Sequence, residues 1–213
     1  MDYMLSDIKM HLEEIFLDVS SLVENKHVFN RFREIMQPNI GITNNVFFDH
    51  YVVNYANSAS AAVRRQADDK SSRGGLKMLL EKILINSALI TKENYLRPYD
   101  ENGLAFEGER IWNERYGGKD SLDPDIVKTD ITRLQSITKP VKDMVDKRVA
   151  HKDKDAHLYN IQYKDLHDAI DLLGELTIKY YSLVASPGSG ISSLLAGNID
   201  GWERIFNEPW VKE

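Results

Sequence analysis

The sequence predicts an all-α fold in which five or six antiparallel helices pack into one bundle with almost no β-strand. Apolar residues recur every three or four positions through most of the 213 residues, and no stretch sustains the apolar–polar alternation of a strand. Hydrophobic residues make up 42% of the chain, which is enough for a substantial core. We expect a helical bundle over residues 1–185, followed by a linker and an apolar segment over residues 186–213 that docks on the bundle or on a partner.

Three helices are predicted in the first third of the chain. One apolar stripe covers residues 5–23. A shorter helix is expected over residues 28–36, because Pro38 and Gly41 end the periodicity there. A third helix is expected over residues 46–63, and its aromatic residues are interpreted as core rather than as a surface for stacking bases: Phe47, Phe48, Tyr51 and Tyr55.

The centre of the chain is predicted to hold one helix and a long irregular insertion. Ser71 and Ser72 are suitable N-cap residues for a helix whose apolar face covers residues 76–88. The adjacent Gly-Gly pair lacks the Gly-Lys-Ser/Thr pattern of a phosphate-binding P-loop. From residue 92 to residue 123 the periodicity fails, except in a short helical candidate around residues 107–116.

Two later helices complete the predicted bundle. Asp123 and Pro124 form an N-cap followed by proline at the first helical position, which is typical of a helix start. Pro140 should kink this helix about two turns before Arg148. A last helix is expected over residues 166–183, and S-P-G-S-G at residues 186–190 is a flexible break before the apolar tail.

Composition excludes several classes of function. The chain has no cysteine, which excludes disulfides, thiolate metal sites and thiol catalysis. Its net charge of −6 argues against broad, sequence-independent binding of long duplex DNA. No apolar run approaches the roughly 20 residues of a membrane span, and the N-terminus lacks the pattern of a signal peptide. We expect a cytoplasmic protein with no membrane contact and no cofactor.

One stretch, residues 141–155, places titratable side chains at the end of an amphipathic helix. Arg148 and His151 continue the apolar face of that helix, because residues three and four positions apart are neighbours on a helix. An unpaired polar group on a buried face costs about 1–3 kcal/mol. The pair is therefore either satisfied structurally by Asp143, Asp146 or Asp153 or kept for chemistry, and the residues alone leave both readings open.

Basic residues gather at two places in this acidic protein. Residues 139–155 hold six Lys or Arg against four Asp, and residues 64–73 form a second basic group. The run H-x-D-x-D-x-H at residues 151–157 is a weaker alternative, a divalent metal site, but a solvated charged turn is the preferred interpretation and no metal is expected. The other histidines sit singly and are expected to be exposed or structurally satisfied: His11, His27, His50 and His167.

Three stretches resemble the abortive-infection U-type (AbiU-like) branch of the HEPN superfamily. Residues 63–80 read V-R-R-Q-A-D-D-K-S-S-R-G-G-L-K-M-L-L, a helix ending in paired arginines, then an acidic turn and a Leu-rich helix. Residues 146–153 read D-K-R-V-A-H-K-D, a helix end with Ala-His followed by Asp. Residues 202–210 form a late segment that closes on Pro-Trp. Together with the order of helices, the resemblance covers most of the chain.

The resemblance implies a HEPN-like antiparallel bundle, usually dimeric, in which the Arg/His motifs of two protomers face one another. Active members are metal-independent endoribonucleases whose motif is an Arg followed, after four to six residues, by a His. Here the histidine corresponds to His151, but Met144, Val145 and Asp146 stand where the arginine is expected. Arg148 is only three residues before His151.

The function implied by the resemblance is that of an RNA- or partner-binding protein in a prokaryotic phage-defence system, either abortive infection or toxin–antitoxin. A homodimer is expected, and an antitoxin or another defence protein is a further expected partner. Contacts to RNA are expected from basic residues of both motif stretches: Lys147, Lys152, Arg64, Arg65 and Arg73.

The alternative is a metal-independent endoribonuclease toxin. Histidine is the one side chain whose unperturbed pKa suits both proton transfers near neutrality, and arginine supplies fixed donors to phosphate. In this alternative His151 and Arg148 are catalytic, and Asp146 or Asp153 orients the imidazole. A dimer would supply one histidine as the base and the other as the acid.

Overall fold

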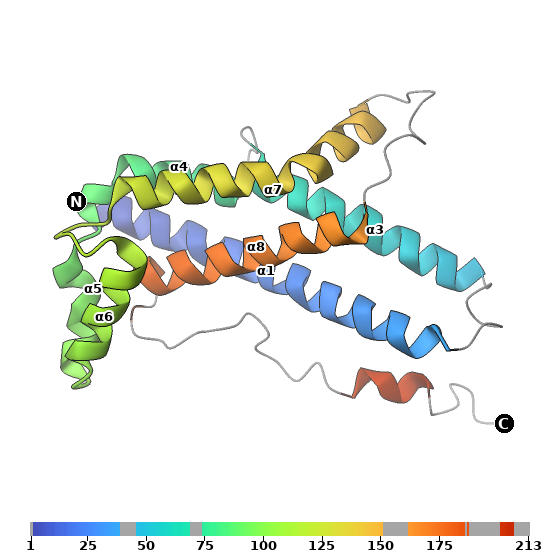
Figure 1. The fold of residues 1–213 in the computed structure, drawn as a ribbon, viewed down its shortest axis with the longest axis horizontal. Helices are drawn as coiled ribbons and strands as arrows, with labels where there is room; N and C mark the ends of the chain where they lie inside the picture. The colour runs from blue at the N-terminus through green and yellow to red at the C-terminus, as the bar shows by residue number, and fades with distance from the viewer. Residues whose placement is uncertain are drawn as a thin grey trace.

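The computed structural model describes residues 2–38, 46–68, 74–150, 162–185, 187 and 201–206, except for the side chains of residues 2, 148–150 and 205. In this part of the chain the structure is helical, with one isolated bridge and no strand, so the predicted all-α class is confirmed. Neighbouring long helices run antiparallel in an elongated bundle (Figure 1). None of the described helices is both long enough and apolar enough to cross a lipid bilayer. The main elements are α1 (Asp2–Met36), α3 (Val46–Ala67), α4 (Leu76–Ile85), α7 (Pro124–Ala150) and α8 (Tyr163–Tyr180).

α1 is one continuous helix of 35 residues, so the prediction of two helices in this region was wrong. Residues 24–27 read E-N-K-H, and none of these residues is a strong helix breaker. The apolar stripe is continued here by Lys26, whose ammonium pairs with Asp171 of α8. A charged residue on the packed face interrupted the apolar pattern without interrupting the helix.

Residues 92–123 are largely helical, so the predicted irregular insertion was also wrong. They form α5 (Lys92–Glu101) and α6 (Ala105–Tyr116), and the second of these contains the short helix expected at residues 107–116. Each helix is too short to show an extended stripe, and Gly103 and Gly117, both with positive φ, follow their ends. Their buried faces are aromatic residues four positions apart: Tyr95, Tyr99, Trp112 and Tyr116.

α4 starts directly against the end of α3 and contacts both α1 and α7. The predicted N-cap at residues 71–72 lies outside the described residues. The Leu76 N–H instead donates to Oε1 of Gln66 at 3.0 Å. A Cβ at Gly75 would lie 2.8 Å from the Gln66 carbonyl oxygen and nearer still to that of Arg65. Glycine at this position therefore has a packing reason that involves no phosphate.

α7 begins at Pro124 as predicted, and the Asp123 carboxylate accepts the Asp125 N–H at 3.1 Å. Pro140 lies within the helix, and Figure 1 shows the last turns of α7 leaving the direction of its first turns. Proline lacks the N–H that would bond to the carbonyl four residues earlier, which accounts for the bend. The last turns nevertheless remain in contact with α3.

The end of the chain returns to α1. A π-helical turn (Tyr181–Ala185) continues α8, and a short 3-10 helix, η4 (Trp202–Phe206), lies against the C-terminal part of α1. The rings of Phe206 and Phe32 lie 5.9 Å apart, and Glu203 pairs with Arg31. The rest of the predicted segment over residues 186–213, apart from residues 187 and 201, lies outside the described residues.

Candidate functional site

Two of the motif stretches meet where α3 ends beside the last turns of α7. Arg64 Nε donates to the Asp146 carboxylate across 82 positions of sequence, and its Nη1 donates to Asp68 at 3.3 Å. Lys142 Nζ donates to the Ala67 carbonyl at 3.1 Å and so binds the last turn of α3. We call this contact zone, residues 63–68 at the end of α3 and 142–150 of α7, the motif region.

Arg64 is held between two carboxylates. Its hydrogen bond to Asp146 raises the pKa of the guanidinium above its usual value, so the group is cationic at all relevant pH. The Arg64 side chain is 38% exposed and that of Asp146 is 48% exposed. Solvent therefore screens the pair, and such pairs contribute at most about 1 kcal/mol. The positive charge of Arg64 is largely compensated within the motif region.

Of the other predicted RNA-binding residues, the structure describes the side chains of Arg65 and Lys147. Arg65 pairs with Asp18 of α1 at 3.6 Å rather than with α7. Lys147 is half-buried beside Asp146 on α7. Arg148 lies on the final turn of α7, but its side chain is not described. The remaining predicted site residues lie outside the described residues: Arg73, His151 and Lys152.

Two of the three positions that would hold the family arginine face the bundle. Met144 and Val145 are only 7% and 8% exposed, so both belong to the core. Asp146, the third position, carries a carboxylate and binds Arg64. An arginine at the first two positions would have to leave this packing to reach a substrate.

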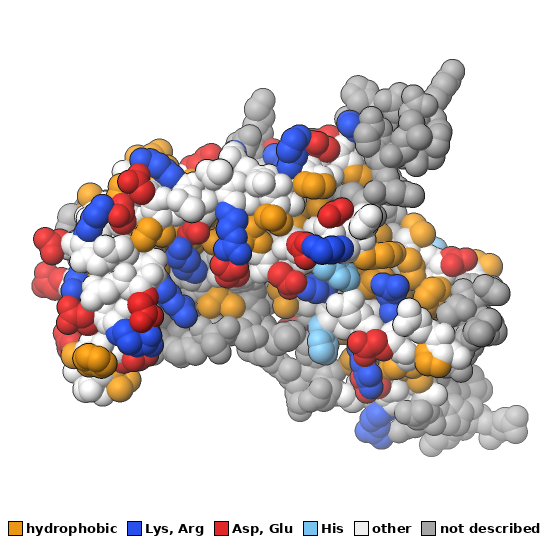
Figure 2. All heavy atoms as spheres, viewed as in Figure 1, with side chains coloured by type: hydrophobic (Ala, Val, Ile, Leu, Met, Phe, Trp, Pro, Cys, Tyr) orange, Lys and Arg blue, Asp and Glu red, His pale blue; other side chains and the backbone are white. Residues whose placement is uncertain are grey.

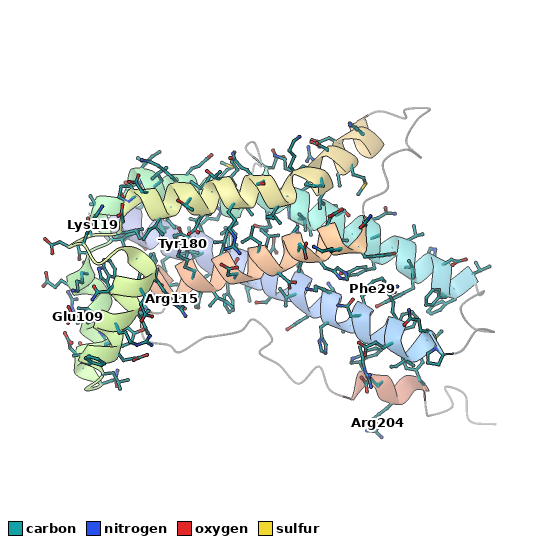
Figure 3. All side chains as sticks on the ribbon, viewed as in Figure 1. Phe29, Glu109, Arg115, Lys119, Tyr180 and Arg204 are labelled. Carbon is teal, nitrogen blue, oxygen red and sulfur yellow. The ribbon has the colours of Figure 1, made fainter. Side chains whose placement is uncertain are left out.

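A second cluster, which we call the aromatic cluster, joins α1, α3 and α8. Phe29 stacks on Tyr55 with ring centroids 3.8 Å apart, and Tyr163 lies 5.3 Å from Phe29. The Tyr55 hydroxyl is 3.1 Å from Nε2 of His167, and Figure 3 labels Phe29 where the three helices converge. Of the aromatic residues expected in the core of α3, Tyr55 is buried, whereas Phe47 is 62% exposed.

The sequence predicted His167 to be an isolated histidine that is either exposed or structurally satisfied, and its hydrogen bond with Tyr55 agrees with the second of these. It missed the cluster around the ring. Burial lowers the pKa of His167, with Lys26 and Arg33 acting in the same direction. The sequence does contain a sign of this cluster. Phe29 and Arg33, like Tyr163 and His167, are four positions apart, so the two members of each pair are neighbours on one face of a helix.

A groove of about 620 Å³ lies between α1 and α3. Arg65 and Asp18 stand among its lining residues, and its other polar side chains are uncharged amides and hydroxyls, among them Asn54 and Asn57. This lining offers little positive charge for a phosphate. Within the described residues no group of three or more His, Asp or Glu is placed to hold a metal ion, and the run at residues 151–157 lies outside them.

The sequence was compared with models of known protein families, with curated proteins and with solved structures. A family model, HEPN_AbiU2, described as AbiU2, matches residues 27–205. No match was found among curated proteins or among solved structures. The matched range includes α3, α7, α8 and both halves of the motif region, and it confirms the predicted resemblance. The chain belongs to the AbiU2 family of HEPN proteins.

Proposed function

We propose that this protein is a homodimeric, RNA-binding component of an abortive-infection or toxin–antitoxin defence system, and that RNA binds at the motif region. Membership of the AbiU2 family supports a role in abortive infection. A cytoplasmic location and an antitoxin partner are parts of the same proposal.

The observation that carries the proposal is the contact between Arg64 and Asp146. It joins two stretches that the family resemblance had singled out separately, so the end of α3 lies beside the last turns of α7 and their basic residues. Lys147 and Arg148 follow on α7, and the helix ends one residue before His151. A local basic site on a chain of net charge −6 fits a short RNA contact better than extended duplex binding.

Binding is favoured over cleavage by two observations, the residues that stand at the positions of the family arginine and the paired charge of Arg64. Two of the three motif positions are buried apolar residues, and the charge of Arg64 is compensated by two carboxylates. Transition-state stabilisation on a phosphorane needs a cation that is directed at the phosphate. Among the other described side chains of the motif region, Arg65 pairs with Asp18, Lys142 donates to the Ala67 carbonyl, and Lys147 has contacts of its own.

A metal-independent endoribonuclease is the second candidate, favoured by the position of His151 directly after the end of α7. Arg148 would then supply the cation, and His151 the proton transfers that histidine performs near neutral pH. A dimer would bring a second copy of each residue to the same scissile phosphate.

RNA binding and RNA cleavage separate the two candidates. Binding is measured by fluorescence anisotropy with a labelled single-stranded RNA at several salt concentrations, and cleavage with total RNA with and without EDTA. We expect wild-type protein to bind and to leave RNA intact, and Lys147→Gln/Arg148→Gln to bind more weakly with a shallower salt dependence. Cleavage that survives EDTA and is lost in a folded His151→Ala variant would establish the second candidate instead. Absence of binding and of cleavage would overturn both.

The dimer is tested separately by light scattering. The chain has a mass of 24.5 kDa, and we expect about twice that value in solution at tens of micromolar protein. A monomer under these conditions would contradict a site shared between two protomers.

A further inference from the structure

Arg33 on α1 is a cation with no carboxylate partner among the described residues. Its guanidinium carbon lies 5.2 Å from the ring centroid of Tyr163 and 5.8 Å from that of Phe29. Arg31, two residues earlier, pairs with Glu34 and Glu203. The rings hold the guanidinium by cation–π contact, which leaves its in-plane N–H donors to be satisfied elsewhere.

His167 supplies a second donor beside Arg33. Burial raises the pKa of the Tyr55 hydroxyl, so Tyr55 keeps its proton, and this hydroxyl shares a 3.1 Å hydrogen bond with Nε2 of His167. The phosphate site proposed below uses the tautomer in which Tyr55 donates in this bond and the imidazole proton resides on Nδ1. Since burial also lowers the pKa of His167, the ring is neutral at pH 7 and Nδ1–H is a donor without charge.

Arg33 and His167 reach the same two rings from different helices. The His167 ring lies 6.1 Å from both Phe29 and Tyr163, the rings that the Arg33 guanidinium also contacts. In Figure 2, basic side chains, a histidine and apolar side chains meet on this face, where α8 crosses α1.

The acids near His167 have cations of their own. Asp171 pairs with Lys26 of α1, and Asp168 pairs with Lys164 one turn earlier on α8. Neither carboxylate binds Arg33. The local charge of Arg33 is therefore not cancelled in the way that the charge of Arg64 is cancelled by Asp146 and Asp68.

We propose that Arg33 and His167 bind a phosphate group of RNA, as a contact site additional to the motif region. The proposal rests on the RNA-binding function proposed above. Arginine presents paired N–H donors that match two phosphate oxygens, and the neutral Nδ1–H of His167 adds a third donor. Residues 151–161 alone separate the end of α7 from Gln162, which precedes α8. Figure 1 shows the end of α7 and the start of α8 in the same half of the bundle. RNA held at the motif region would have a further phosphate within reach of this pair.

The test compares Arg33→Gln with Arg31→Gln, a matched change two residues away on α1. Affinity for a labelled single-stranded RNA is measured across a salt series, with thermal melts to confirm that each variant is folded. Arg33→Gln should weaken binding about tenfold, as expected for the loss of one charged hydrogen-bonding group, and reduce the slope of log K against log salt by about 1. Arg31→Gln should behave as wild type, because its charge is already paired.

Nitrogen-15 NMR of the His167 ring shows whether RNA reaches this histidine. If Arg33 had only a structural role, adding RNA would leave the ring resonances in place. We expect the Nδ1–H resonance to shift when RNA is added to wild type and to stay in place in Arg33→Gln. RNA binding that is unchanged in a folded Arg33→Gln variant would overturn this phosphate site and leave the proposed function standing. Absence of RNA binding by wild type would overturn both.

Discussion

The α5–α6 end of the bundle and the motif region are built on different principles. At the α5–α6 end, aromatic side chains are buried and their polar atoms are bonded. Trp112 Nε1 donates to the Lys119 carbonyl at 2.8 Å, and the Tyr116 hydroxyl donates to the Lys179 carbonyl at 3.0 Å. In the motif region the contacts between charged side chains are ion pairs of partly exposed groups, which lie over buried residues such as Val63 and Met144. The motif region can therefore change its charges with little effect on the stability of the fold.

Two aspartates of α7, one buried and one exposed, show the same contrast. Asp130 of α7 is 7% exposed and accepts hydrogen bonds from Lys179 Nζ at 2.6 Å and from the Tyr180 hydroxyl at 2.7 Å. Asp146 of the same helix binds Arg64 in a solvated setting. The carboxylate of Asp130 stabilises a buried hydrogen-bond network, whereas that of Asp146 compensates the positive charge of Arg64 at the surface of the motif region.

The largest effect is expected from Trp112→Ala. The side chain is fully buried and its Nε1 is bonded, so its loss should lower the free energy of unfolding by about 4 kcal/mol. Urea denaturation followed by circular dichroism measures this. Phe106→Ala on the same helix is the control, because that ring is 83% exposed and its loss should change stability by at most about 0.5 kcal/mol. A loss for Trp112→Ala no larger than that for Phe106→Ala would show that burial of this ring does not stabilise the α5–α6 end.

Asp130→Ala should destabilise the protein by about 3 kcal/mol, because it leaves the Lys179 ammonium and the Tyr180 hydroxyl without their acceptor. Chemical denaturation again gives the value. The control is Asp125→Ala, one turn earlier on α7, whose side chain is 77% exposed. A loss at Asp130 no larger than at Asp125 would show that the network adds nothing to stability.

Much of the fold was predictable, and the misses have physical causes. The start of α7 was found because Asp123 and Pro124 act locally, as a cap and a preset φ angle. The continuity of α1 was missed because Lys26 occupies a packed position, which only its pairing with Asp171 explains. α5 was missed because its buried face is only two tyrosines, Tyr95 and Tyr99.

The candidate site was predictable only in part. The stretches that carry it were found from short residue patterns, but the meeting of Arg64 with Asp146 depends on how helices far apart in sequence pack. The aromatic cluster was missed for the same reason, because its members come from three helices. The catalytic role of His151 stays a prediction.

Acid sensitivity distinguishes the aromatic cluster from the α5–α6 end. The pKa of His167 is lowered in the folded state, so the unfolded chain binds the proton more tightly. Stability should be fully present above the unfolded value near pH 6.5 and fall as the pH drops below it. Unfolding measured from pH 7.5 to pH 5 in wild type and in His167→Phe tests this. A pH dependence that is the same in both proteins would remove His167 as its source.

The smallest effect on stability is expected from Arg64→Ala, at most about 1 kcal/mol, because both of its ion pairs are solvated. Thermal melts of Arg64→Ala, Asp146→Ala and the double variant give the coupling energy directly. A loss above about 2 kcal/mol would show that the pair fastens α3 to α7, and the motif region would then resemble the α5–α6 end.

The tight approach at Gly75 has a consequence for how this family is interpreted. Any side chain there would collide with the backbone of Arg65 and Gln66, so a library of all substitutions should retain glycine alone. In an alignment of related sequences, Gly75 should be as strongly conserved as a catalytic residue. It also lies close to Arg64 and Arg65, so its conservation could be mistaken for a sign of nucleic-acid binding. Such conservation would result from the close approach of two backbone segments and would be no evidence of RNA binding.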